Sequence, residues 1–160
     1  MKYLSILLCI TVVVVCLCLS GCGGSHAQTL ALIDKERQSV AFLHDYATGL
    51  ETARLEKKPA LVFFAVSDNV GSQRMMETTF TDDEIKRLSE RLVCIHVDAV
   101  QETTLCETLK ITSFPTIVLF NANGMEIRRL AGRQTPDQLA VQIHVLLQAM
   151  AARSQATTGR

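Results

Sequence analysis

Residues 60–72 read Ala60-Leu61-Val62-Phe63-Phe64-Ala65-Val66-Ser67-Asp68-Asn69-Val70-Gly71-Ser72, and they contain the strongest indication of the chain's architecture. Its first seven residues are apolar without alternation, which predicts a strand buried on both faces and therefore central in a sheet. Small and polar residues from Ser67 onward then indicate a turn. A short helix containing Met75 and Met76 follows that turn.

The segments on either side predict helices and strands in alternation. Upstream, Asp45 can cap a helix that runs to about Lys57. Downstream, we expect a helix after the capping box at 81–84, a strand at 92–97, a short helix at 102–110 and a strand at 116–120. A turn at 121–124, a polar edge strand at 125–130 and a last helix follow, and a second capping box, with Thr135 as the cap and Gln138 completing it, starts that helix. This order predicts an α/β fold with a central mixed β-sheet flanked by helices.

The N-terminus indicates export and a lipid anchor. Residues 4–19 form an uncharged apolar run, shorter than the roughly 20 residues of a transmembrane helix and typical of a signal peptide. The run ends in Leu19-Ser20-Gly21-Cys22, which resembles the lipobox of bacterial lipoproteins. The resemblance implies that Cys22 is acylated and that residues 1–21 are removed. An uncleaved anchor, or an ordinary secretory leader with an incidental cysteine, is the alternative.

The remaining chain is long enough for one domain. We assign residues 22–39 to a tether, 40–150 to the domain and 151–160 to a flexible tail. The lipobox resemblance implies a bacterial cell membrane location, with the domain facing the periplasm or the cell exterior. Basic and acidic residues balance at 16 each, so nucleic-acid binding has no electrostatic support.

Four motifs in register resemble landmarks of the thioredoxin superfamily. They lie at residues 58–64, 76–82, 97–98 and 114–116, and the Thr-Thr-Phe at 78–80 is similar to the branch of periplasmic thioredoxins. The resemblance covers the segment 40–150 and implies a thioredoxin-like fold. It also implies that Pro115 follows a cis peptide bond beside the active site.

The same resemblance places the redox Cys-x-x-Cys pair at positions 69 and 72, where this chain has Asn69 and Ser72. Asp68 stands where an aromatic residue precedes the pair, and Phe63 where some members bury an acid. An amide and a hydroxyl cannot perform thiol–disulfide exchange, so we predict a degenerate site without catalytic residues. Polar side chains of this turn are expected to cap the following helix. Anion binding at the helix N-terminus is an alternative that Asp68 opposes.

Only two cysteines remain for the folded domain. Of the six in the chain, three lie in the leader and Cys22 is the predicted lipid acceptor, which leaves Cys94 and Cys106. Each is expected to be a small core residue, and whether they pair depends on their separation in the fold. The four histidines and these cysteines lack metal-site spacing, so we predict neither metal nor cofactor.

The leading hypothesis is a non-catalytic, lipid-anchored thioredoxin-like protein that binds an exported protein or peptide. In the family, the surface beside the cis-proline grips a partner's extended backbone. The corresponding positions here are Asp68, Asn69, Val70, Gly71, Ser72, Phe114 and Pro115. The alternatives are a thiol–disulfide oxidoreductase or redox-homeostasis protein using Cys94 or Cys106, and a structural envelope lipoprotein. The sequence leaves open the partner's identity, the oligomeric state and which membrane carries the anchor.

Overall fold

One mixed sheet organises the domain. The structure, a computed structural model, describes residues 39–158, so the predicted signal peptide, Cys22 and nearly all of the tether lie outside the described residues. The sheet has the strand order β2-β1-β3-β4. Its strands are β1 (Ala60–Ala65), β2 (Val93–Asp98), β3 (Thr116–Phe120) and β4 (Glu126–Ala131). β1 pairs in parallel with β2, whereas the β1–β3 and β3–β4 pairs are antiparallel. The predicted mixed sheet is therefore confirmed.

Strand β1 is the central strand that its unbroken apolar run predicts. All of its residues are buried. Because successive side chains of a strand point to opposite faces, Leu61 and Phe63 pack in one core cluster, whereas Val62 and Phe64 pack in the other. Strand β4 lies at the sheet edge and is largely exposed, as its polar composition predicts.

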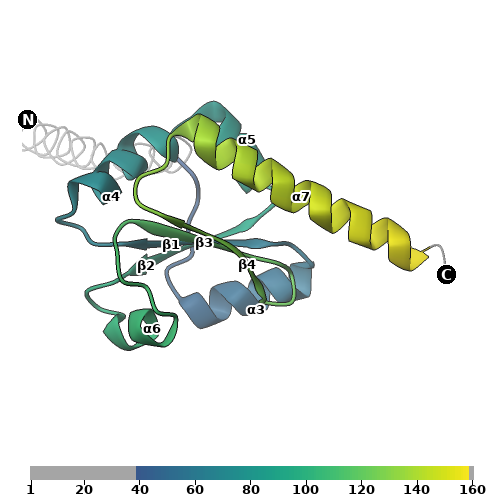
Figure 1. Cartoon of the computed structure of the whole chain (residues 1–160), viewed down its shortest axis with the longest axis horizontal. Coiled ribbons are helices and arrows are strands. Elements are labelled where there is room, and N and C mark those ends of the chain that lie inside the picture. Colours follow the sequence, from purple (N-terminus) through teal and green to yellow (C-terminus); the bar gives the residue numbers. More distant parts are fainter. Residues whose placement is uncertain (1–38, 159–160) are drawn as a thin grey trace, which may run out of the picture. The chain divides into compact units, whose positions relative to one another are not determined.

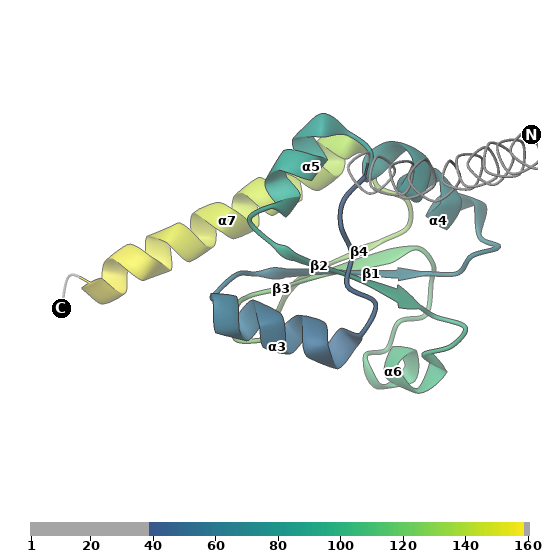
Figure 2. The same ribbon diagram turned by 180° about the vertical axis from the view of Figure 1, so that it is seen from behind.

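Helices cover both faces of the sheet. Helices α3 (Tyr46–Glu56) and α6 (Thr103–Thr108) lie on one face, and α4 (Val70–Arg74), α5 (Asp83–Ser89) and α7 (Pro136–Thr158) lie on the other (Figures 1 and 2). A π-helical turn, η1 (Met75–Thr79), continues α4 toward α5. The sheet therefore separates two cores, and the predicted layer arrangement is confirmed.

Two of the predicted helix caps form as expected. The Asp45 carboxylate accepts a hydrogen bond from Thr48 N at 2.6 Å at the start of α3. At the start of α7, Thr135 Oγ1 accepts from Gln138 N at 3.3 Å, and Gln138 Oε1 accepts from Thr135 N at 2.9 Å. These reciprocal bonds make a capping box.

Helix α7 is longer than the sequence analysis assumed. It continues to Thr158, so residues 151–158, which we assigned to the tail, extend the helix. Alanines at positions 149, 151 and 152 favour this continuation, because alanine has the highest helix propensity. Nevertheless, no helix within residues 39–158 combines the length and apolar character that crossing a membrane requires.

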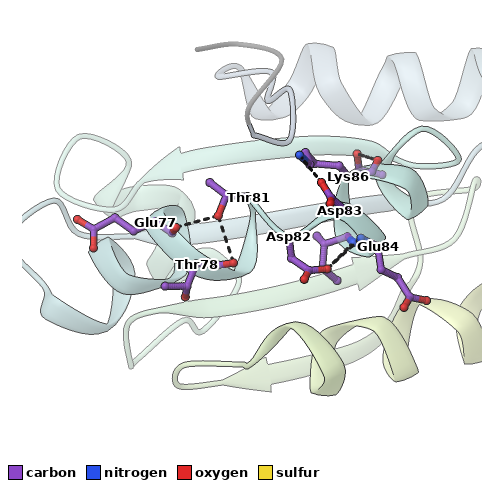
Figure 3. Close-up of polar contacts among 9 residues, drawn as sticks. Glu77, Thr78, Thr81, Asp82, Asp83, Glu84 and Lys86 are labelled. Atoms are coloured by element: carbon purple, nitrogen blue, oxygen red, sulfur yellow. Dashed lines mark hydrogen bonds and ion pairs between the residues drawn. The ribbon is translucent and has the colours of Figure 1, made fainter. Parts of the chain in front are cut away.

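The cap of α5 differs from the prediction. The capping box at 81–84 would begin with Thr81, but Asp82 is the N-cap, and its carboxylate accepts from the backbone N–H groups of Glu84 and Ile85 at 3.0 and 3.2 Å (Figure 3). The Thr81 hydroxyl instead donates to the Glu77 carbonyl at 2.8 Å. A carboxylate interacts more strongly than a hydroxyl with the positive end of a helix, so the helix starts one residue later.

A segment before α3 pairs with the outer edge of β2, which the sequence analysis did not predict. Leu43 N donates to the Cys94 carbonyl at 2.9 Å, and His96 N donates to the Leu43 carbonyl at 2.8 Å. Upstream, the buried Val40 donates its N–H to the Phe80 carbonyl at 2.8 Å. This segment therefore satisfies backbone groups that an open sheet edge would leave unpaired.

Candidate functional site

The polar turn after β1 folds into the start of α4. Asn69 is the N-cap, and its Oδ1 accepts a hydrogen bond from Ser72 N at 2.9 Å. Asn69 N donates to the Val66 carbonyl at 3.0 Å, and Gln73 Nε2 donates to the Ser67 carbonyl at 2.8 Å. The prediction that a polar residue of this turn caps the helix is confirmed, and the capping residue is Asn69.

Ser72 faces the protein interior. Only 3% of the residue is exposed, and its Oγ accepts from Val66 N and donates to Asn69 Oδ1, both at 3.4 Å. A serine nucleophile needs a general base within hydrogen-bond reach. Among the described hydrogen bonds of this hydroxyl, none involves a histidine, so the arrangement fits a structural role.

Pro115 lies directly beside this turn. The Phe114–Pro115 peptide bond is cis, as the resemblance implies. A Cβ atom placed on Gly71 would lie 3.0 Å from Pro115 Cδ and 3.1 Å from Asn69 Oδ1. The turn therefore approaches the proline about as closely as a glycine backbone allows. The structure thus brings together the predicted residues of the turn and the proline that precedes β3.

The outer side of this surface combines apolar and polar groups. Val70, the first residue of α4, is 65% exposed. Asp68 is also exposed, and Phe114 is half-buried. Phe114 packs partly against the core cluster on the α3 and α6 face, so Val70 is the exposed apolar side chain that the turn offers to a ligand.

A pocket of about 310 Å³ opens beside the same turn. Its lining includes Ala65, Ser72, Met76, Glu77, His96 and Asp98. The sequence analysis missed the contribution of His96 and Asp98, although they are alternate residues near the end of β2 and therefore share one face. The two methionines after the turn differ in position: Met75 is fully buried, whereas Met76 lines the pocket.

His96 is packed among aromatic rings. Its ring stacks on Phe63 with centroids 5.5 Å apart and lies edge-on to His44 at 5.5 Å. Burial lowers the pKa of His96, the nearby His44 lowers it further, and Asp98 opposes the shift. The His96 ring is therefore neutral at neutral pH.

The two cysteines are free and lie on opposite faces of the sheet. Cys94 belongs to the core cluster beneath α5 and α7, and Cys106 to the cluster beneath α3. Burial raises the pKa of Cys94 to about 12. Burial, and secondarily the charge of Glu102, raises the pKa of Cys106. Both thiols therefore stay protonated near neutral pH, which makes them poor nucleophiles.

No group of three or more histidine, cysteine, aspartate or glutamate residues in the described part of the chain could hold a metal ion. The mixed sheet, the helix that starts after its central strand and the cis-proline beside that helix define a thioredoxin-like α/β protein. The sequence profile of the thioredoxin-like domain family matches residues 46–145, and the chain belongs to this family.

Solved structures with the same fold include thioredoxins and an oxidoreductase. A thioredoxin from Thermus thermophilus is 20% identical, with a TM-score of 0.61 over 68% of this chain and 88% of that one. The DsbH oxidoreductase is 22% identical, with a TM-score of 0.55 over 71% and 85%. A thioredoxin-fold protein from Helicobacter pylori is 17% identical, with a TM-score of 0.53 over 57% and 70%. At these identities the likeness shows the fold alone. No curated protein matches the chain in sequence.

The lowered pKa of His96 predicts a pH-dependent stability. We expect stability to fall as the pH decreases below about 6.5, because His96 takes up a proton there in the unfolded chain while the folded ring resists it. His96→Phe keeps an aromatic ring against Phe63 but cannot titrate, so it should flatten this part of the profile. Melting temperatures between about pH 7.5 and pH 5 measure the effect.

The matched control for this measurement is His144→Gln, which changes a half-buried histidine on α7 and leaves His96 in place. The control should retain the pH dependence of the native chain. An equally steep profile in His96→Phe would assign the dependence to other groups.

Proposed function

We propose that this protein is a non-catalytic, lipid-anchored binding module of the bacterial cell envelope. It holds an extended segment of an exported protein or peptide on the surface formed by residues 68–72 with Phe114 and Pro115. The observation that carries the proposal is the cap at Asn69. The position that the family resemblance gives to the nucleophilic cysteine holds an amide that accepts a hydrogen bond from Ser72 N.

The state of the two thiols weighs against the alternative of an oxidoreductase. A thiol must be deprotonated and reachable to attack a disulfide. Cys94 and Cys106 are buried, have raised pKa values and lie in separate cores.

With thiol–disulfide exchange disfavoured, the surface beside Pro115 supports the binding of an extended peptide. The turn closes against the proline at Gly71, and Val70 projects its apolar side chain into solvent. An extended peptide can use such a surface, because its backbone can form hydrogen bonds while alternate side chains contact apolar groups. The membrane anchor in this proposal rests on Leu19-Ser20-Gly21-Cys22. It would keep the binding module at a membrane surface.

Peptide binding is tested by selecting extended peptides on the full-length protein and measuring their affinities. We expect Val70→Asp to weaken the selected peptides by about tenfold or more, because a charge replaces an apolar contact. An aspartate in the first turn of a helix does not destabilise that helix, so the loss reports binding. Val141→Asp, at a comparably exposed valine on α7, is the control and should leave the affinities unchanged. Failure to select any peptide would favour the structural lipoprotein.

Thiol chemistry is tested by insulin reduction. The full-length protein should not reduce insulin disulfides above background, because it lacks an accessible thiolate. Asn69→Cys combined with Ser72→Cys places a thiol pair at the two turn positions and should allow a disulfide to form, measured by thiol titration. Activity of the unmodified protein that disappears in Cys94→Ser or Cys106→Ser would establish the oxidoreductase instead.

The anchor is tested by metabolic labelling with a fatty-acid analogue. Cys22→Ala removes the predicted acyl acceptor, so it should abolish labelling and leave an unprocessed precursor. Cys18→Ala, within the leader, is the control and should label like the native chain. Equal labelling of the native protein and Cys22→Ala would refute lipidation at this residue.

A further inference from the structure

The pocket beside the turn has an unbalanced charge. Its lining contains the carboxylates of Glu77 and Asp98 and no lysine or arginine. An adjoining pocket of about 340 Å³ shares His96 and Asp98 and adds His44, Gln101 and Glu102, so its lining also contains no lysine or arginine. The two pockets together therefore present negative charge to a ligand.

The two carboxylates of the first pocket have no basic partner within the described part of the chain. The ion pairs there use other acids, namely Glu51, Glu56, Asp83, Glu84 and Glu126. Asp98 Oδ1 accepts a hydrogen bond from Val100 N at 2.9 Å. That bond fixes the Asp98 side chain, and none of the ion pairs among residues 39–158 compensates its charge.

The remaining walls of the pocket are suited to an aliphatic stem. Ala65, Val66 and Met76 line it together with the two acids. Lysine and arginine side chains place methylene groups along apolar surface and keep the charged end near polar groups. The neutral His96 ring adds no competing positive charge. Anionic ligands are disfavoured by the same carboxylates.

We propose that this pocket binds a lysine or arginine side chain of the extended peptide. The inference rests on the proposed function, because it assigns the cation to the peptide that lies beside Pro115. The turn links the two places: Gly71 faces Pro115, whereas Ser72 and Gln73 line the pocket. A peptide that crosses this turn would therefore contact the proline and insert a basic side chain beside Glu77 and Asp98.

The inference is tested by an NMR titration of the full-length protein in detergent micelles. The probes are N-acetyl-lysine methylamide and N-acetyl-norleucine methylamide, which lacks the ammonium group. We expect the lysine probe to shift the amide signals of Gln73, Glu77 and Asp98 saturably. The affinity of the norleucine probe should be at least about fivefold lower than that of the lysine probe, because norleucine has no charge to interact with the carboxylates.

Glu77→Gln combined with Asp98→Asn should lower the affinity of the lysine probe about five- to tenfold and leave the norleucine probe unchanged. Asparagine can still accept the hydrogen bond from Val100 N, so the loop is retained. Glu51→Gln combined with Asp83→Asn removes two carboxylates elsewhere and controls for net charge. Equal binding of the two probes, or an unchanged lysine affinity in the first double variant, would overturn the inference.

The peptide selection separates this inference from the proposed function. Selected peptides enriched in lysine or arginine, whose advantage is lost in Glu77→Gln with Asp98→Asn, support both. Selected peptides without a preference for basic residues overturn the inference and leave the proposed function intact. If the lysine probe binds but no peptide can be selected, the proposed function is wrong. The inference that the basic side chain belongs to a bound peptide is then wrong as well.

Discussion

The pairing of β1 with β2 on one side and β3 on the other places the candidate site. β1 runs parallel to β2 and antiparallel to β3, and Phe64 near its end pairs with Thr116 at the start of β3. The end of one strand and the start of its antiparallel neighbour therefore lie side by side. This register brings Pro115, one residue before β3, to the turn that follows β1, and Gly71 provides the close contact between them.

At the start of α4, the side chain of Asn69 caps the helix and offers no reactive thiol. Free N–H groups and the helix dipole at such a position lower the pKa of a cysteine and stabilise its thiolate. Here Asn69 uses its side-chain oxygen to satisfy Ser72 N, and the Ser72 hydroxyl faces Val66 and Asn69. Hydrogen bonds between neutral groups thus hold the turn at the start of α4, while Val70 stays exposed to solvent.

The two sides of the turn differ in chemical character, and this difference suggests a division of roles. The side toward Pro115 has close backbone contacts and apolar groups, which suit a peptide backbone and its apolar side chains. The side toward β2 has a pocket with Glu77 and Asp98 and a neutral His96. In the proposed complex, the first side provides general affinity for an extended chain and the second provides selectivity for a basic residue.

Several features could be predicted from the order of amino acids alone, namely the central position of β1, the edge position of β4, the caps at Asp45 and Thr135 and the family resemblance. These features depend on apolar patterning and on side chains within a few residues of each other. The packed fold was needed to show that Cys94 and Cys106 lie in different cores. It was also needed to show that residues of β2 share a pocket with the turn. Such relations follow from strand order and register, which join segments distant in the chain and leave no local pattern in the sequence.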